Sequence, residues 1–274
     1  MISWIDGVRG TRIDWRDRGL QYGDGLFETM RVRAGRIRLL DRHLERLLAG
    51  CARLGMTPPP SGRLRRELAA AAAGQDDAVL KLIVTRGRGE RGYRPTGRER
   101  ATRILSRWPA PSSSGHAPAP PITVRICRTR LASNPALAGL KTLNRLESVL
   151  ARSEWRDPRI VEGLMLDVEG HVVCGTMSNL FVRHGTVLAT PLLDRCGVAG
   201  VMRGFVLGEA RALGLRPSER RIGLQDLASA EEAFITNALT GPVPIGVIRH
   251  GRERWRPRAT EAARRLHERL GAWR

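Results

Sequence analysis

The order of hydrophobic and polar positions before residue 108 is typical of a mixed α+β domain. Short apolar stretches are separated by turn signals at Asp6-Gly7 and Ala34-Gly35, and the second turn is predicted to close a hairpin. From Asp41, a candidate N-cap, leucines recur at the three- and four-residue spacing of a helix. The predicted strands are 26–32, 36–40, 78–85 and 101–107, the predicted helices are 41–54 and 64–73, and a Gly/Arg-rich loop covers 86–93.

The pattern after residue 121 contains more strands than helices. Glu169-Gly170 and His184-Gly185 are turn signals within two further hairpins. Strands and helices do not alternate here as they would in a doubly wound parallel sheet. The predicted strands are 122–127, 164–168, 171–174, 180–182, 187–189 and 233–236; one predicted helix begins just beyond Lys141, others cover 200–213 and 260–270, and 237–244 is a Gly/Pro-rich loop.

Residues 108–121 are rich in proline, serine and alanine, and no periodic structure fits them, so we predict a linker. It divides the chain into a small mixed α/β N-terminal domain, 1–107, and a larger strand-rich C-terminal domain, 122–274, which contains Lys141. The predicted fold class is therefore α+β with two domains.

The chain has 274 residues and a formal net charge of +20, which invites a nucleic-acid-binding interpretation. Its arginines are spread from Arg9 to Arg274 among 27 acids, and two tyrosines and four phenylalanines are few for base stacking. We therefore expect no nucleic acid partner, although a basic nucleic-acid binder stays an alternative.

No apolar run reaches the roughly 18–20 residues of a membrane helix. The beginning of the chain is unlike a signal peptide, and its four cysteines lack the spacing of disulfides or zinc sites. We expect a soluble, cytoplasmic protein without a metal site or membrane contact.

Lysine is rare in this chain, in which Lys81 and Lys141 stand beside 45 arginines. Arginine keeps its charge, whereas a lysine amine can lose its proton and form a Schiff base, so a lysine retained in such a chain is a candidate for covalent chemistry. Lys141 is predicted to lie where a strand meets the start of a helix. Lys81 lies inside the alternating strand 78–85, where we expect it on a solvated outer face. The sequence therefore favours Lys141.

Glycines at positions 197, 200 and 204 open the predicted helix at 200–213. Free amides at the start of a helix bind anions, most often phosphate. Glycine-rich helix starts are common, so this pattern alone is a weak indication of an anion site.

An ordered set of motifs resembles the fold-type IV pyridoxal-phosphate family, which contains branched-chain and D-amino-acid aminotransferases and aminodeoxychorismate lyases. The set spans nearly the whole chain, and its order makes the match specific. Within the family, Arg91-Gly92-Tyr93, Asn134 to Gly139 and Lys141 to Glu147 look most like the aminodeoxychorismate lyases. The full set is Asp17 to Thr29, His43 to Leu47, Lys141 to Asn144, Glu169-Gly170, Asn179 to Phe181, Gly200 to Arg203 and Asn237 to Leu239.

The resemblance implies a two-domain fold-type IV enzyme, a pyridoxal 5'-phosphate cofactor, a homodimer and a small dicarboxylate substrate. It makes Lys141 the lysine that forms the Schiff base and later carries the proton. It also makes Arg46 a phosphate ligand, although Arg46 falls off the apolar stripe of its predicted helix, as a solvated arginine would. Further residues implied at the site are Cys174, Val201, Met202, Asn237 and Ala238 for the cofactor, and Phe27, Arg86 and Arg91 for the substrate.

Cys174 departs from the family pattern. The resemblance places it where members usually have a glutamate that holds a proton on the pyridine nitrogen of the cofactor, which makes the ring an electron sink. A thiol is a weaker partner for that nitrogen. The alternative interpretation of Cys174 is a small hydrophobic core residue.

The resemblance implies a lyase that converts 4-amino-4-deoxychorismate to 4-aminobenzoate and pyruvate for folate biosynthesis. Formation of an aromatic ring helps to drive this reaction, so we expect it to tolerate a weak electron sink better than transamination does. One alternative is an aminotransferase for branched-chain or D-amino acids on the same fold. Another is a cofactor-binding relative with reduced catalysis.

Overall fold

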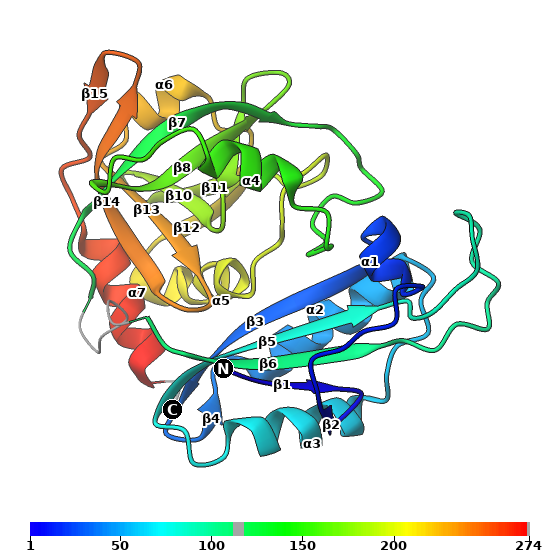
Figure 1. Ribbon diagram of the computed structural model, residues 1–274. Coiled ribbons are helices and arrows are strands. Elements are labelled where there is room, and N and C mark those ends of the chain that lie inside the picture. Colours follow the sequence, from blue (N-terminus) through cyan, green and yellow to red (C-terminus); the bar gives the residue numbers. More distant parts are fainter. Residues whose placement is uncertain (112–117, 273–274) are drawn as a thin grey trace. The chain divides into compact units, whose positions relative to one another are not determined.

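The computed structural model describes residues 1–111 and 118–272, and these form two compact units (Figure 1). The described part of the first unit comprises 1–111 and Leu140–Asn144, and that of the second comprises 118–139 and 145–272. The predicted linker, 108–121, overlaps the end of a strand, and its residues 112–117 lie outside the described ranges. Lys141 groups with the first unit, although the position of the predicted linker put it in the C-terminal domain.

The first unit is built on an antiparallel sheet. Its described strands are β1 (Ile2–Ile5), β2 (Val8–Arg9), β3 (Gly25–Arg33), β4 (Arg36–Ile37), β5 (Asp77–Thr85) and β6 (Arg103–Pro109), in the order β2-β1-β6-β5-β3-β4. The predicted turns Asp6-Gly7 and Ala34-Gly35 have positive φ at both positions, as the tight turns that match strand twist require. The predicted hairpin of β3 and β4 is confirmed, but β4 ends at Ile37.

Helices α2 (Leu40–Arg53) and α3 (Ser61–Ala72) pack on this sheet, α2 against β3 and α3 against β4 and β5, and a short helix α1 (Arg18–Tyr22) precedes β3. The predicted N-cap at Asp41 is wrong, because α2 begins one residue earlier and Leu39 takes the N-cap position with φ 54°. Asp41 lies in the first turn, where a carboxylate interacts favourably with the helix dipole. The predicted helical spacing is confirmed, since the apolar stripes are buried: Leu44, Leu47, Cys51, Leu64 and Leu68.

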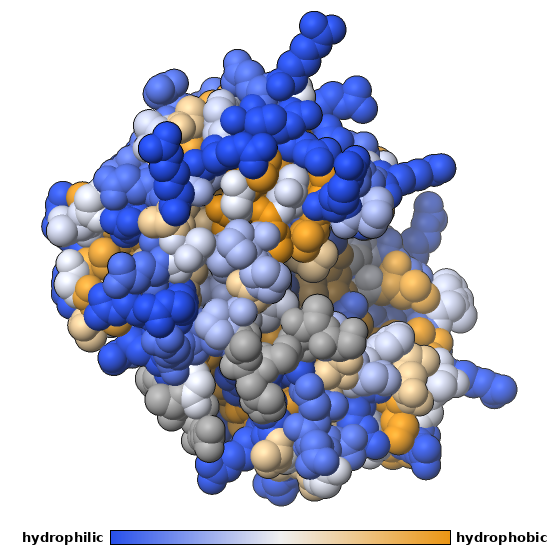
Figure 2. Space-filling view, turned by 90° about the vertical axis from the view of Figure 1, so that its left-hand side faces the viewer, coloured by the Kyte–Doolittle hydropathy of each residue, from blue (hydrophilic) through white to orange (hydrophobic). Residues whose placement is uncertain are grey.

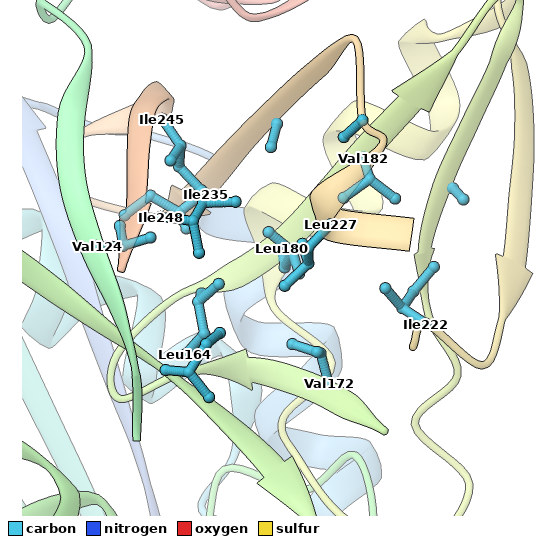
Figure 3. Packing of buried hydrophobic residues seen from close by; sticks show 14 of the residues in the cluster. Val124, Leu164, Val172, Leu180, Val182, Ile222, Leu227, Ile235, Ile245 and Ile248 are labelled. Atoms are coloured by element: carbon cyan, nitrogen blue, oxygen red, sulfur yellow. The ribbon is translucent and has the colours of Figure 1, made fainter. Parts of the chain in front are cut away.

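The second unit is built on a larger mixed sheet. Its described strands are β7 (Ile122–Leu131), β8 (Ile160–Asp167), β9 (Val172–Gly175), β10 (Asn179–His184), β11 (Val187–Pro191), β12 (Arg216–Arg220), β13 (Glu232–Asn237), β14 (Gly241–His250) and β15 (Glu253–Trp255). They follow the order β12-β11-β10-β13-β14-β7-β8-β9, with β15 beside β14. The pairs β11–β12, β14–β7 and β7–β8 are parallel. Apolar residues of these strands form the core in Figure 3, among them Val124, Leu164, Leu180 and Ile235. The α+β fold class is confirmed.

Strand β14 occupies a segment that was partly predicted to be a Gly/Pro-rich loop. Pro242 and Pro244 lie opposite Thr236 and Phe234 of β13. A proline fits a ladder where its missing N–H would point away from the partner strand. Residues two apart point the same way, and β14 pairs with its other neighbour, β7, only from Ile245 onward. The two prolines therefore remove no hydrogen bond that this sheet needs.

The described helices of the second unit are α4 (Leu146–Arg152), α5 (Val201–Glu209), α6 (Leu224–Ala228) and α7 (Glu261–Ala272), with a 3-10 turn at Arg211–Leu213. The predicted helix start next to Lys141 is wrong, because α4 begins only at Leu146. Leu146, Val149 and Leu150 are exposed. The helical spacing of these residues therefore marks a surface stripe of α4 and not a core face.

Hydrophilic residues cover most of the face shown in Figure 2, with hydrophobic residues in groups between them. Across residues 1–111 and 118–272, no helix is both long and apolar enough to cross a membrane.

Candidate active site

Lys141 is held beside Phe27 at the beginning of β3. The backbone of its segment hydrogen-bonds to that strand, since the Phe27 amide donates to the Lys141 carbonyl and the Leu143 amide donates to the Gly25 carbonyl, both at 3.0 Å. The Lys141 Nζ lies 4.2 Å from the centre of the Phe27 ring. An amine on a fixed backbone loses little freedom when it meets a reacting atom, which favours a catalytic role.

Lys81 lies beside the same aromatic ring. Its Nζ is 5.3 Å from the centre of the Phe27 ring. Lys81 pairs with Thr29 across the β3–β5 ladder, and Thr29 shares a face of the sheet with Phe27. Lys81 therefore lies on the less buried face of the sheet, as predicted, but it is half-buried there and not fully solvated. Alternation along a strand separates the two faces but does not say how far each of them is solvated.

Arg46 is bound by a buried carboxylate. Its Nε donates to Glu28 Oε1 at 2.8 Å, its Nη2 donates to Oε2 of the same residue, and His43 Nδ1 lies 2.6 Å from that Oε2. Glu28 and His43 are each 1 % exposed. Arg46 is thus not the solvated arginine that its position off the apolar stripe suggested. The sequence could not identify this contact, because Glu28 comes from β3 and Arg46 from α2.

The charges of this group follow from its burial. Burial alone would raise the pKa of Glu28, but hydrogen bonds from His43 and Arg46 outweigh it and hold that pKa below its ordinary value. Burial lowers the pKa of His43, and the Glu28 carboxylate only partly opposes this effect. At neutral pH, His43 is therefore neutral and donates its Nδ1–H to an ionised Glu28, which also accepts from Arg46.

Arg86 is a structural clamp. Its Nε donates to Asp24 at 2.7 Å, and its two terminal nitrogens donate to the carbonyls of Leu54 and Gly55 at 2.8 Å, just beyond the end of α2. Asp24 also accepts from Arg18 at 2.9 Å. Each nitrogen of Arg86 thus donates a hydrogen bond within the first unit, and the substrate contact predicted for Arg86 stays a prediction.

Arg91 lies in the loop between β5 and β6 and is exposed. The loop is held by the Gly92 amide, which donates to the Tyr22 hydroxyl at 3.1 Å. The rings of Tyr22 and Tyr93 pack edge to face with their centres 5.4 Å apart. Arg91 forms no ion pair with the described residues, so it stays a candidate for binding an anionic substrate.

The second unit contains a helix start that suits an anion. Helix α5 begins after Gly200, and no side chain caps its first amides, which include those of Val201 and Met202. Asn179 lies against this start: its Nδ2 donates to the Val198 carbonyl at 2.8 Å, and a Cβ on Gly200 would lie 2.1 Å from its Oδ1. The absence of a side chain at Gly200 therefore lets the Asn179 side chain approach the start of α5, and the amides at a helix start suit a phosphate.

A buried hydroxyl supports the anion site and was not recognised from the sequence. Thr236, opposite Asn179 on β13, is 1 % exposed, and its Oγ1 has no hydrogen-bond partner among the described residues. A buried polar group without a partner costs free energy that a bound ligand can recover. Next to it, Asn237 Oδ1 accepts from the amides of Leu239 and Thr240 at 2.9 Å, which fixes the turn through Ala238.

Cys174 lies on β9 and packs against an apolar cluster that includes Trp155, Met165 and Val173. Burial raises the pKa of its thiol to about 12, so the group stays protonated at neutral pH. These contacts agree with the interpretation of Cys174 as a small hydrophobic residue. A neutral thiol also supplies no negative charge to a ligand.

Known proteins share the sequence and the fold of this chain. Residues 25–248 match the family described as Amino-transferase class IV. The chain is 34 % identical to the aminodeoxychorismate lyase of Vibrio harveyi, over 90 % of this chain and 91 % of that protein. It is 46 % identical to the crystal structure of 4-amino-4-deoxychorismate lyase from Pseudomonas aeruginosa, with a TM-score of 0.90 over 98 % of this chain and 97 % of that one. It shares the fold of a PLP-bound hypothetical aminotransferase from Mycobacterium tuberculosis, at 22 % identity and a TM-score of 0.82, with 98 % of each chain covered.

The family match contains both Lys141 and the start of α5. Its extent agrees with the ordered motifs of the sequence, which run from the beginning of the first unit to the loop after β13. The chain therefore belongs to the class IV aminotransferases, whose members bind pyridoxal phosphate.

Proposed function

We propose that the protein is an aminodeoxychorismate lyase that uses pyridoxal 5'-phosphate to convert 4-amino-4-deoxychorismate to 4-aminobenzoate and pyruvate in folate biosynthesis. The observation that carries this proposal is the similarity, over nearly the whole length, to the aminodeoxychorismate lyases of Vibrio harveyi and Pseudomonas aeruginosa. The Arg91-Gly92-Tyr93 loop and the Lys141 segment, which resemble those of the lyases, support it.

The residues that we assign to the cofactor lie on several elements. Pyridoxal phosphate, when bound, supplies an aldehyde for an amine and a conjugated ring that withdraws electrons from the substrate. Lys141 is the amine that we assign to that aldehyde. We assign the phosphate to Arg46, to the first amides of α5, and to the turn at Asn237-Ala238. The hydroxyl of Thr236, buried without a partner in the described structure, supports this assignment.

Lys141 would also move the proton. Its Nζ takes a proton from the substrate ring carbon that bears nitrogen, the carbon–oxygen bond to the side chain breaks, and a proton is delivered to the methylene carbon that becomes the methyl group of pyruvate. Atoms balance without an oxidant or a second substrate. Because the product ring is aromatic, the step would demand less of the electron sink, which would suit a neutral Cys174 at the position that the resemblance assigns to the partner of the ring nitrogen.

The substrate is a dicarboxylate, so it needs cations. We assign its carboxylates to Arg91 and Lys81, and contact with its ring to Phe27. Lys81 is supported by its position 5.3 Å from the Phe27 ring, and Arg91 by its exposure. Arg86 is a weaker candidate, because each of its nitrogens already donates a hydrogen bond to Asp24, Leu54 or Gly55.

We also propose that the enzyme is a homodimer, as the resemblance implies. The exposed apolar residues Leu146, Val149 and Leu150 on one side of α4 support this, because such groups commonly mark interfaces between proteins. Light scattering on a size-exclusion column measures the assembled mass, and a monomer at all concentrations would contradict the proposal.

The test of the activity is pyruvate release from 4-amino-4-deoxychorismate without any keto acid, followed with lactate dehydrogenase and NADH. In parallel, branched-chain and D-amino acids are supplied with 2-oxoglutarate, and keto-acid formation is measured. We expect pyruvate release to dominate. Amino transfer without pyruvate release would identify an aminotransferase. A protein that binds the cofactor but catalyses neither reaction would be a relative with reduced catalysis.

A further inference from the structure

Glu28 is a buried carboxylate that hydrogen-bonds to both Arg46 and His43. We propose that Glu28 is a positioning residue that presents the Arg46 guanidinium to the cofactor phosphate. The inference rests on the proposed pyridoxal-phosphate function and deepens it, since it concerns how the phosphate ligand is held before the cofactor binds.

The geometry of the pair fixes the guanidinium plane. Glu28 accepts from Nε and Nη2 of Arg46, which form one edge of that plane. The opposite edge, with Nη1, is therefore directed away from Glu28. His43 Nδ1, 2.6 Å from Oε2, prevents rotation of the carboxylate, and both acid and imidazole are 1 % exposed. A flexible side chain with several rotatable bonds is thus reduced to one orientation.

The substitution Glu28→Gln should change the affinity for the cofactor in opposite directions, depending on how Glu28 acts. If Glu28 acted only through its charge, its removal would strengthen phosphate binding, because a negative charge near a dianion is lost. If Glu28 positions Arg46, its removal frees the arginine, and cofactor binding must then order that side chain again. We expect the second effect to prevail, because the buried Glu28 charge is already balanced by Arg46. Weaker binding of pyridoxal phosphate by Glu28→Gln would therefore indicate a positioning role, and tighter binding would indicate a charge effect.

The measurement is the dissociation constant of pyridoxal phosphate for the full-length protein stripped of cofactor, followed by tryptophan fluorescence. We expect Glu28→Gln to raise this constant about tenfold, an effect within the range for residues in direct contact. Pyridoxal, which lacks the phosphate, should bind wild type and variant alike. A weakening of both ligands would indicate general damage to the site and would overturn the proposal, as would unchanged or tighter binding of pyridoxal phosphate.

The first unit offers a matched control. Arg103 of β6 donates from Nε and Nη2 to the two oxygens of Glu67 of α3, both at 3.0 Å, so it forms the same kind of two-bonded pair. Glu67→Gln should leave the affinity for pyridoxal phosphate unchanged. A weakening by Glu67→Gln equal to that by Glu28→Gln would assign the effect to stability.

A double-mutant cycle tests whether Glu28 acts through Arg46. In an Arg46→Ala background there is no arginine to position, so adding Glu28→Gln should not weaken binding further. Equal weakening in both backgrounds would overturn the proposal. Pyruvate release by wild type is measured separately, so a failed lyase activity with an intact cycle contradicts only the substrate assignment.

Discussion

Lys141 and Lys81 share an aromatic neighbour, Phe27, so charge alone does not distinguish them. Lys141→Arg keeps a cation at this position but removes the amine that can form a Schiff base. We expect the visible absorbance of the cofactor-loaded protein to disappear and pyruvate release to fall by several orders of magnitude. Lys81→Arg is the matched control and should keep the absorbance. The opposite result would reverse the roles of the two lysines.

Cys174 predicts a pH dependence of stability. Burial raises the pKa of its thiol to about 12, whereas a thiol in an unfolded chain titrates near its ordinary value of about 8.5. The folded protein holds this proton more tightly, so the contribution of Cys174 is fully present below the ordinary value and is lost as the pH rises toward 12. Urea unfolding between about pH 9 and 11 should show a smaller loss for Cys174→Ala than for wild type. If the free energy of unfolding falls equally with pH in wild type and in Cys174→Ala, burial does not raise the pKa of the Cys174 thiol.

At the scale of elements, local pattern predicted what local contacts determine. The hairpin at Ala34-Gly35 and the buried stripe of α2 were predicted because turn chemistry and helical spacing act over a few residues. Strand β14 was missed, because its prolines are tolerated only at the ladder positions that β13 and β7 leave open. Similarly, the start of α2 depends on the backbone of Leu39, whose positive φ is disfavoured for a branched side chain and carries no sequence signal.

The turn between β3 and β4 stores strain that a substitution can release. Ala34 has φ 45°, a conformation that is unfavourable for a residue with a Cβ atom. Gly35 has φ 73° but no Cβ atom, so its conformation is not strained. Ala34→Asn should stabilise the protein by about 0.5–1 kcal/mol, because asparagine tolerates this conformation and favours such turns. Gly35→Ala should destabilise it by about 1 kcal/mol. Chemical denaturation measures both, and a loss of stability in Ala34→Asn would contradict the assigned turn.

Arg86 connects the end of α2 to Asp24 and is expected to act on stability. Arg86→Lys cannot bond Asp24, Leu54 and Gly55 together, so we expect a loss of about 1–3 kcal/mol from partners left unsatisfied. The KM for aminodeoxychorismate should change little. If Arg86→Lys instead raises the KM and leaves the free energy of unfolding unchanged, the result would support the substrate role predicted for Arg86. The same two measurements on Arg91→Lys show what the loss of a candidate substrate ligand looks like.

At the scale of the whole molecule, each unit contains one feature of the candidate site that the sequence predicted and one that it did not. The glycines before and within α5 predicted its start as an anion site, and the scarcity of lysine in the chain indicated Lys141. The environment of Arg46 was not, because Glu28 lies 18 positions earlier on another element. The orphaned Thr236 hydroxyl was also invisible, since an unsatisfied group exists only once its neighbours are placed.

The composition of the whole chain makes Lys141 chemically addressable. In this sequence only Lys81, Lys141 and the amino terminus carry aliphatic amines, and the 45 arginines stay charged and unreactive toward an acetylating reagent at neutral pH. After acetylation of the cofactor-free protein and addition of pyridoxal phosphate, pyruvate release should be lost in step with modification of Lys141, measured by peptide mass spectrometry. Bound pyridoxal phosphate should protect Lys141.

Pyridoxamine 5'-phosphate separates covalent protection from shielding, because it carries the same phosphate but no aldehyde for Lys141. Both ligands should shield Lys81 equally, since that effect depends only on occupancy near Phe27. Lys141 should be protected more strongly by pyridoxal phosphate, because only that ligand engages its amine in a bond. Equal acetylation of Lys141 with either ligand would contradict its covalent role. If activity were lost in step with acetylation of Lys81 alone, Lys81 and not Lys141 would be the essential amine.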